Sequence, residues 1–248
     1  RQRQMCIRDR QYYYPVHRWS AWTAIETDDG VVNMERTCSI CGKTETAKIP
    51  DPCIGDKYCA GGVFDDMPAA DDWSHAGIDY CVLFGLMSGI GNDLFDPAGE
   101  TTRAMLVSML YRMAGEPDVS ELPELSFEDV TADAWYADAV RWAYANEVSV
   151  GVDDTHFAPD ARLTRAQLVT MLYRVFGPEK GVRPRPIGGY EDWNTVPEWA
   201  FSATTWAVSM GLLYGTSSWE LSPNDGASRA QLAAIIMRTC QLQGELDS

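Results

Sequence analysis

The sequence lacks any apolar run that approaches the ~18 residues needed for a membrane-spanning helix. It also lacks the apolar core of a signal peptide near its first residue. We therefore predict no insertion into a membrane. Residues 1–10 are expected to be non-native or disordered, because residues 5–10 resemble a translated sequencing adapter.

Positive charge is scarce, with 20 Lys and Arg against 36 Asp and Glu and a net charge of −16. Residues 1–50 carry 8 basic against 6 acidic side chains, whereas residues 51–248 carry 12 against 30, a net of −18. Such an acidic body repels nucleic acid phosphates and anionic membranes at long range. We therefore predict that nucleic acid is not a partner of this chain.

Recognisable catalytic and cofactor motifs are missing as well. The three histidines, His17, His75 and His156, lie in unrelated contexts and show no spacing typical of a metal site or a catalytic triad. No phosphate-binding loop or nucleophile motif occurs, and the paired acids do not fit the 12-residue alternation of a calcium loop. We predict that the chain is not an enzyme and needs no cofactor.

Four of the seven cysteines lie close together, between residues 38 and 59; the other three are Cys6, Cys81 and Cys240. This cluster consists of Cys38, Cys41, Cys53 and Cys59. It suits either local disulfides in an oxidising compartment or a four-thiolate zinc site in a reducing one. The second pair is spaced more widely than zinc ribbons usually allow, so disulfides are favoured.

Alternating residues and turn glycines around the cysteines predict two or three short strands. We therefore interpret residues 11–62 as a small Cys-containing, β-rich module. Its size fits a segment that needs cross-links because it cannot build a large core.

The rest of the chain carries one pattern three times. Counted from a tryptophan, a glycine follows at +16, a proline at +24, and arginines at +30 and +39. The motif tryptophans are Trp73, Trp135 and Trp199; the motif glycines are Gly89, Gly151 and Gly215; the motif arginines are Arg103, Arg165 and Arg229. Markers kept without gaps through three copies identify a repeat protein. We assign residues 63–114 to repeat 1, 126–176 to repeat 2 and 189–241 to repeat 3.

Each repeat is predicted to contain two helices. The first begins near the motif tryptophan, and Gly85 or Gly211 can close it with a positive φ. Repeat 2 has Glu147 at that position, so we expect its cap to differ. The second helix begins at the motif arginine, after a hydroxyl residue that can cap it. These residues are Thr102, Thr164 and Ser228. The arginines at +39 are expected to cap helix C-terminal carbonyls.

In order, each repeat shows an aromatic-x-Asp, a Trp, a Gly, a Phe/Leu-x-Pro, and a Thr/Ser-Arg-Ala stretch. This series resembles the S-layer homology motif. The resemblance implies a mainly α fold in which three helix-loop-helix repeats form a pseudo-threefold spindle. It also implies non-covalent anchoring of an exported protein to the Gram-positive cell wall. The ligand would be a pyruvylated secondary cell wall polymer, bound in grooves between repeats, and the location extracellular.

Carried over residue by residue, the resemblance assigns ligand binding to the motif arginines, tryptophans and glycines. The acidic residue that follows the family's Thr-Arg-Ala is replaced by Met105, Gln167 and Gln231, and Leu221 replaces the usual Phe. These departures predict one or two working grooves instead of three equal ones.

Each of these positions could also have a purely structural role instead of binding a ligand. An arginine at a helix N-terminus can bind a carboxylate bidentately or bridge a neighbouring Asp. The tryptophan can stack on a sugar or pack beneath its own loop. The glycine is expected to serve backbone geometry first, with close ligand approach as a consequence.

Two other functions remain open for the repeats, beside a zinc-dependent recognition role for the Cys-containing module. The chain can be the anchor fragment of a larger surface enzyme, or its repeats can be degenerate and serve protein–protein assembly in a surface layer. As an isolated domain we expect it to be a monomer.

Overall fold

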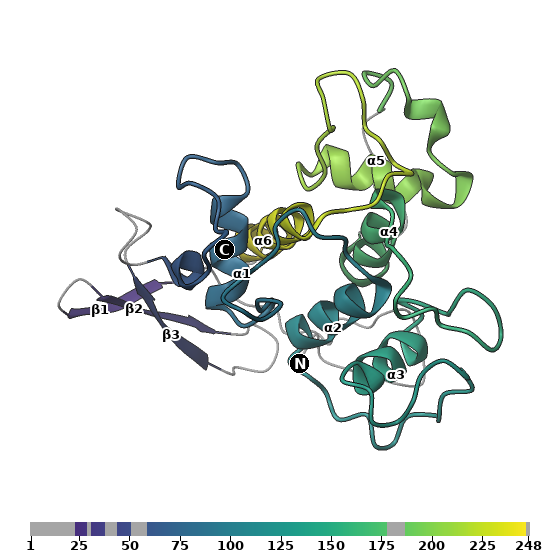
Figure 1. Ribbon diagram of the computed structural model, residues 1–248, viewed down its shortest axis with the longest axis horizontal. Helices are drawn as coiled ribbons and strands as arrows, with labels where there is room; N and C mark the ends of the chain where they lie inside the picture. Colours follow the sequence, from purple (N-terminus) through teal and green to yellow (C-terminus); the bar gives the residue numbers. More distant parts are fainter. Residues whose placement is uncertain (1–22, 29–30, 38–43, 51–58, 178–186, 247–248) are drawn as a thin grey trace. The chain divides into compact units, whose positions relative to one another are not determined.

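The computed structural model describes residues 23–28, 31–37, 44–50, 59–177 and 187–246 (Figure 1). The described part is mainly helical, as predicted, with six α-helices. Residues 1–10, His17 and three of the clustered cysteines, Cys38, Cys41 and Cys53, lie outside the described residues.

Three strands precede the repeats and form an antiparallel sheet in the order β1-β2-β3. They are β1 (Thr23–Asp28), β2 (Val31–Thr37) and β3 (Thr44–Pro50). The pairing of β1 with β2 shifts by one residue between Ala24 and Glu26. A short 3-10 helix, η1 (Ala60–Val63), then leads into repeat 1.

Each repeat supplies two α-helices, at the positions that its sequence predicts. The first helices start two residues after the motif tryptophan: α1 (His75–Leu83), α3 (Ala137–Ala145) and α5 (Phe201–Ser209). The second helices start at the motif arginine: α2 (Arg103–Met113), α4 (Arg165–Phe176) and α6 (Arg229–Leu246). Repeat 3 adds two 3-10 turns, η2 (Trp193–Thr195) and η3 (Glu198–Ala200).

The chain divides into two compact units whose boundaries fall inside repeats 1 and 3. The first unit joins the described residues up to Gly99 with those from Ser228 onward, and the second is Glu100–Ala227. In the first unit α1 packs on α6; in the second, α2 packs on α3 and α4 on α5. Each first helix therefore packs on the second helix of the preceding repeat, with α6 of repeat 3 serving repeat 1.

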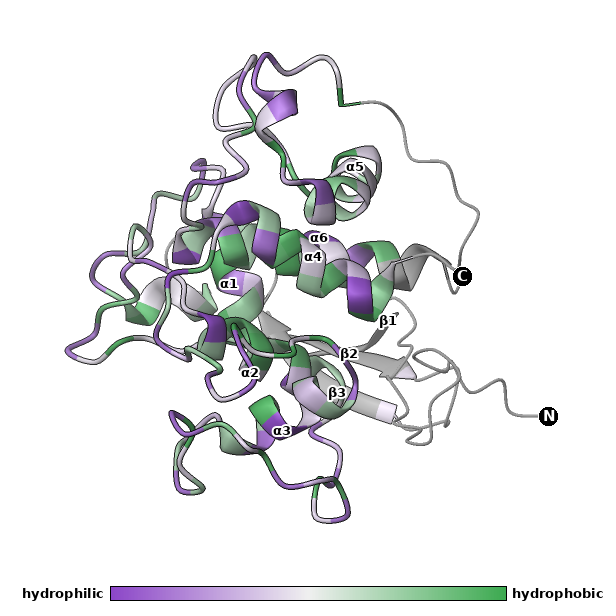
Figure 2. Cartoon of the chain, turned by 90° about the vertical axis from the view of Figure 1, so that its right-hand side faces the viewer, coloured by the Kyte–Doolittle hydropathy of each residue, from purple (hydrophilic) through white to green (hydrophobic). Residues whose placement is uncertain are grey.

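Apolar faces explain these pairs. Figure 2 shows hydrophobic and hydrophilic residues side by side along the ribbons of α4 and α6, as in amphipathic helices. The predicted stripe is buried at Leu106 and Leu110 of α2 and at Leu168 and Leu172 of α4. In the first unit Gly77 lets α1 approach α6 closely, because a Cβ there would lie 2.7 Å from the Cα of Ala234. A single helix could not bury such a stripe alone.

Three equivalent residues of the second unit bind one another in a ring. The backbone N–H of Thr101 donates to Ala227 O at 3.0 Å, that of Ala227 to Leu163 O at 2.9 Å, and that of Leu163 to Thr101 O at 2.8 Å. Each lies two residues before a motif arginine. The ring therefore gives one residue from each repeat the same pair of backbone contacts.

The helix caps confirm one prediction and correct another. Thr102 and Thr164 accept from the backbone N–H of the third helical residue at 3.3 and 3.2 Å, and Ser228 does so at 3.2 Å. The expectation that the cap of repeat 2 differs is wrong. Glu147 has φ 51°, close to the 64° of Gly85 and the 67° of Gly211, so a non-glycine residue adopts the same left-handed geometry.

Candidate functional site: three buried arginine clamps

The motif arginines are the first residues of α2, α4 and α6 and are almost completely buried, with exposures of 5%, 3% and 6%. In each, Nε donates to a backbone carbonyl of the next repeat. Arg103 reaches Phe157 O at 2.9 Å, and Arg165 reaches Leu221 O at 3.1 Å. Arg229 of repeat 3 reaches Phe95 O of repeat 1 at 2.8 Å.

A second nitrogen of each guanidinium, Nη2, binds an earlier point of the same loop. Arg103 donates to Ser149 Oγ at 2.9 Å, Arg229 donates to Ser88 O at 2.7 Å, and Arg165 donates to the carbonyl of Tyr214. Each motif arginine thus clamps both ends of the loop that belongs to the following repeat.

All of these acceptors are neutral oxygens. Among the described residues, no carboxylate forms an ion pair with a motif arginine, so the alternative of an arginine that bridges a neighbouring Asp is not realised there. Burial lowers the pKa of each motif arginine from its ordinary value. That ordinary value is so far above neutrality that the guanidinium stays charged. The third nitrogen, Nη1, donates to no acceptor within the described part of the chain.

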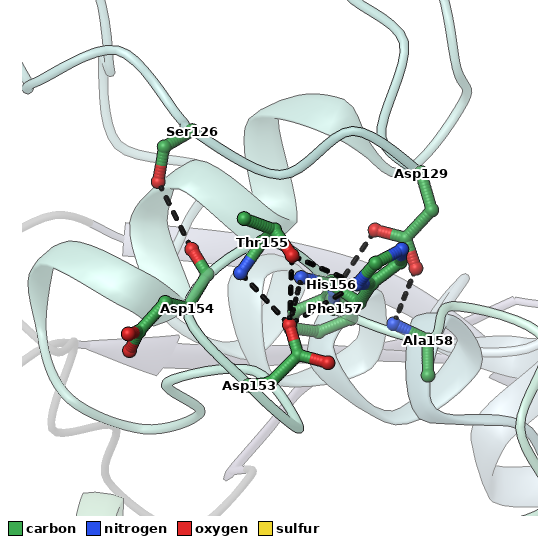
Figure 3. A network of polar contacts seen from close by, with 8 residues as sticks. All are labelled: Ser126, Asp129, Asp153, Asp154, Thr155, His156, Phe157 and Ala158. Atoms are coloured by element: carbon green, nitrogen blue, oxygen red, sulfur yellow. Dashed lines mark hydrogen bonds and ion pairs between the residues drawn. The ribbon is translucent and has the colours of Figure 1, made fainter.

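The clamped loop is held from its other side by an aspartate, as Figure 3 shows for repeat 2. The two carboxylate oxygens of Asp129 accept from the backbone N–H groups of Phe157 and Ala158 at 2.8 and 2.7 Å. Asp66 and Asp192 do the same in their repeats. We call Asp66, Asp129 and Asp192 the motif aspartates. They follow the aromatic residue of the sequence motif, and their role was missed because their partners lie about thirty residues away.

The residue after each clamped carbonyl lies in the left-handed region. These residues are Asp96, Ala158 and Ser222, with φ of 58°, 58° and 52°. None is glycine, so the geometry costs about 1–2 kcal/mol and has to be imposed by the surrounding contacts. The paired bonds to the motif aspartate supply that constraint.

An aromatic ring lies beneath two of the three guanidiniums. Cζ of Arg103 is 4.8 Å from the ring centroid of Phe157, and Cζ of Arg229 is 4.5 Å from that of Phe95. This stacking orients the guanidinium plane. Arg165 meets Leu221, whose side chain has no ring, at the equivalent point.

The motif glycines lie beside the clamps, but their main constraint is packing. A Cβ on Gly151 would lie 2.7 Å from the Phe127 ring, and one on Gly215 would lie 2.7 Å from the Tyr190 ring. Gly89 is similarly close to Phe64. Among the three, Gly151 alone has a positive φ, of 90°. All three motif glycines are thus required by the close approach of an aromatic ring, and Gly151 is required by its backbone conformation as well.

The motif tryptophans are exposed, at 59%, 65% and 58% for Trp73, Trp135 and Trp199. In the described part of the chain, no hydrogen bond or ring contact joins them to the motif arginines. The structure therefore brings the predicted arginines and glycines together and leaves the tryptophan faces open to solvent.

A polar turn precedes the clamped carbonyl of repeat 2 (Figure 3). Oδ1 of Asp153 accepts from the backbone N–H groups of Thr155 and His156, both at 2.8 Å, and contacts Nδ1 of His156 at 3.1 Å. The bond from Thr155 N–H and those from His156 lower the pKa of Asp153 to about 2. The bond to Asp153 raises the pKa of His156.

A second polar cluster joins η1 to α1 in the first unit. Sγ of Cys59 lies 3.0 Å from Asp79 Oδ1 and 3.3 Å from His75 Nε2, and His75 Nδ1 lies 2.7 Å from Pro68 O. Cys81, in α1, is a buried free thiol. No group of three potential ligands in the described ranges is placed to hold a metal ion. The sequence analysis did not predict this cluster, because His75 and Asp79 lie 16 and 20 residues after Cys59.

One of the arginines at +39 differs from the expected helix cap: Nη1 of Arg174 donates at 3.0 Å to Val148 O, a loop carbonyl three residues after the end of α3. None of the helices in the described residues is both long and apolar enough to cross a membrane.

Comparison with known proteins identifies the repeats. The family model of the S-layer homology domain matches residues 63–104, 126–169 and 189–233. The surface-layer 125 kDa protein of Lysinibacillus sphaericus is 31% identical over 63% of this chain and 13% of its own length. The S-layer protein sap of Bacillus anthracis is 26% identical over 79% of this chain and 23% of its own. The exoglucanase XynX of Acetivibrio thermocellus is 25% identical over 67% and 15%. The chain thus spans less than a quarter of these relatives.

Proposed function

The chain belongs to the S-layer homology family, and from this premise we propose that it binds a pyruvylated secondary cell wall polymer in the grooves between its repeats. S-layer homology domains anchor surface proteins to the cell wall, so the chain is a cell-surface protein. The proposal adds the ligand, the residues that bind it and a purely non-covalent, non-catalytic mode of attachment.

The observation that carries the proposal is the burial of three guanidiniums whose hydrogen-bond acceptors, among the described residues, are all neutral oxygens. A buried charge is costly unless an opposite charge accompanies it. A carboxylate from the ligand supplies that charge, and Nη1 of each motif arginine can bind it while Nε and Nη2 keep the loop clamped. The N-terminus of the helix favours the same anion.

The exposed motif tryptophans complement this anion site. An indole face suits the apolar side of a sugar ring or the methyl group of a pyruvyl ketal. Residues 51–248 carry a net charge of −18, so an acidic glycan gains nothing from long-range attraction. Binding therefore comes from local contacts, and it should weaken with salt while remaining specific for the sugar.

Some of the similar proteins are enzymes, including the exoglucanase XynX of Acetivibrio thermocellus and the amylopullulanase of Thermoanaerobacterium thermosulfurigenes. This chain matches only 15% and 9% of their lengths. It fits the anchoring part of such proteins, and the proposal assigns it no catalytic role and no cofactor.

Co-sedimentation with purified cell walls tests the function. The chain should pellet with intact walls and stay in solution with walls from which the secondary polymer has been extracted. Retention on polymer-free walls would instead point to protein–protein assembly, and it would contradict the proposal.

Single substitutions of the motif arginines test the site. Arg→Gln variants at positions 103, 165 and 229 keep hydrogen-bonding capacity and remove the charge, and circular dichroism checks that each remains folded. At least one should bind wall polymer clearly more weakly than the wild type. If all three folded variants bind like the wild type, the arginine assignment is wrong.

A further inference from the structure

We infer that the three arginine sites are unequal and that the one formed by Arg103 and Ser149, with Arg174 beside it, is the principal site for a sugar-borne carboxylate. The inference rests on the proposed function. It adds Ser149 and Arg174, which the family resemblance does not assign, as residues that determine where the ligand binds.

Ser149 makes the first difference between the sites. Equivalent positions in repeats 1 and 3 hold the apolar residues Met87 and Leu213. There the arginine's Nη2 donates to a backbone carbonyl, of Ser88 or Tyr214, whereas Arg103 donates to the hydroxyl of Ser149 at 2.9 Å.

A carbonyl oxygen can only accept a hydrogen bond, but a hydroxyl can accept one and donate another. Ser149 is 1% exposed, and its O–H donates to no acceptor in the described part of the chain. Beside it, Nη1 of Arg103 has no acceptor there either. Two buried donors at one point, both attached to groups held in place by other bonds, form a site for an anion.

The surrounding charge makes the second difference. Arg174 donates through Nη1 to Val148 O at 3.0 Å, the carbonyl directly before Ser149, so two guanidiniums are bound to adjacent residues of one loop. After burial, the charge of Arg174 is the main cause that lowers the pKa of Arg103, and Asp129 opposes it.

For the other two arginines, every charged neighbour that shifts the pKa raises it. The neighbours that raise the pKa of Arg165 are Asp225, Tyr190 and Asp192, and those that raise the pKa of Arg229 are Asp96 and Asp66. Their charges are therefore partly offset by the protein, whereas Arg103 also faces a second cation. An anionic ligand gains most at Arg103.

The chemistry of the site matches a carboxylate carried by a sugar. A carboxylate has two oxygens, which can accept from Arg103 Nη1 and from the Ser149 hydroxyl together. The Phe157 ring, 4.8 Å from Cζ of Arg103, holds the guanidinium plane for such a pair. The carboxylate can come from a pyruvyl ketal or from a uronic acid, since both present the same group.

Calorimetric titration of the full chain tests the inference. The probes are the methyl glycoside of 4,6-pyruvylated N-acetylmannosamine and methyl glucuronide. We expect Arg103→Gln and Ser149→Ala each to weaken binding of the preferred probe by about 10-fold or more, the loss expected for one hydrogen bond to a charged group. Ser149→Thr should restore most of the affinity because it returns the hydroxyl.

Ser108→Ala is the matched control. Ser108 is a buried serine of α2 whose hydroxyl has no hydrogen-bond partner in the described structure, and removing it should leave affinity unchanged. Arg174→Gln should weaken binding by a smaller factor, of about 3. Arg165→Gln and Arg229→Gln should have less effect than Arg103→Gln. Thermal unfolding confirms that each variant is folded.

The outcomes separate the inference from the proposed function. Preference for the ketal over the glucuronide, or the reverse, identifies the source of the carboxylate, and either supports the site. If folded Arg103→Gln and Ser149→Ala bind like the wild type, or if the wild type binds neither probe, the inference is wrong even when the chain still pellets with intact walls. If the wild-type chain does not pellet with intact walls, the proposed function is wrong.

Discussion

Both peptide groups of Phe157 are held by charged side chains, with the N–H bound to Asp129 and the C=O bound to Arg103. The two bonds come from opposite sides of one residue and from two different repeats. A single residue therefore links the internal order of repeat 2 to its contact with repeat 1. Phe95 and Leu221 occupy the same position in repeats 1 and 3.

Glu147 offers a test of backbone strain. A non-glycine residue with φ 51° loses about 1 kcal/mol relative to glycine at such a helix end. Glu147→Gly should therefore raise the free energy of unfolding by about 1 kcal/mol in urea titrations. Gly211→Ala, at the equivalent position of repeat 3, should lower it by a similar amount. If Glu147→Gly lowers the free energy of unfolding, the backbone of Glu147 is not strained as we infer.

The Asp153–His156 turn predicts a pH-dependent contribution to stability. The raised pKa of His156 stabilises the fold fully below its unfolded value of about 6.5, and this contribution is lost as pH rises through the folded pKa. The lowered pKa of Asp153 contributes above its unfolded value and is lost as pH falls toward about 2. Both contributions are present together from about pH 4 to about pH 6.5.

Comparing His156→Gln with the wild type tests this pair. The difference in urea midpoint should be larger at about pH 5 than at about pH 8.5, where the wild-type imidazole is neutral. In an Asp153→Asn background the turn keeps its acceptor but loses its charge, so the pH dependence of the difference should disappear. A difference that does not vary with pH would show that the ion pair adds nothing to stability.

At the scale of elements, the motif aspartates act as staples for the clamped loops. Asp129→Ala removes the acceptor of two backbone N–H groups, one of which belongs to the fully buried Phe157. Two charge-assisted bonds of this kind contribute about 3 kcal/mol together. We expect a loss of that size in urea unfolding. Asp129→Asn keeps one accepting oxygen and should lose clearly less; equal losses would show that the paired geometry is unimportant.

Sequence alone predicted the elements whose causes are local. The hydroxyl before each motif arginine starts α2, α4 and α6, and the spacing after the tryptophan places α1, α3 and α5. It did not predict which helices pack together, because the partner of α1 is α6, more than a hundred residues later. Such pairing depends on the cyclic order of the repeats, which periodicity does not encode.

The site was predicted in the same uneven way. Repetition singled out the motif arginines and glycines, and the structure brings them together. Ser149 escaped notice because it interrupts the pattern: its counterparts are Met87 and Leu213. The expectation for Glu147 failed for a different reason, since the packing around a helix end can impose a backbone conformation that the residue itself disfavours.

At the scale of the whole molecule, removal of repeat 3 is the decisive deletion. It takes α6 away from α1, the loop with Leu221 and Tyr214 away from Arg165, and Ala227 out of the backbone ring. Linear repeat arrays often tolerate the loss of an end unit, because each unit contacts only its neighbours. We expect a chain ending at residue 188 to lose most of its helical circular dichroism and its cooperative unfolding.

Deletion of residues 1–58 is the comparison for that experiment. It leaves every contact among the three repeats that is described above, and a cooperative transition should therefore persist. Retention of a cooperative fold by the chain ending at residue 188 would show that the repeats behave as independent units.

The clamps have a consequence for survival outside the cell. Each motif arginine holds a loop of a different repeat, and the last repeat holds the first. A protease that cuts the backbone once between two repeats would leave the pieces bound to each other through these clamps and the helix pairs. A nicked anchor of this design would stay assembled on the wall.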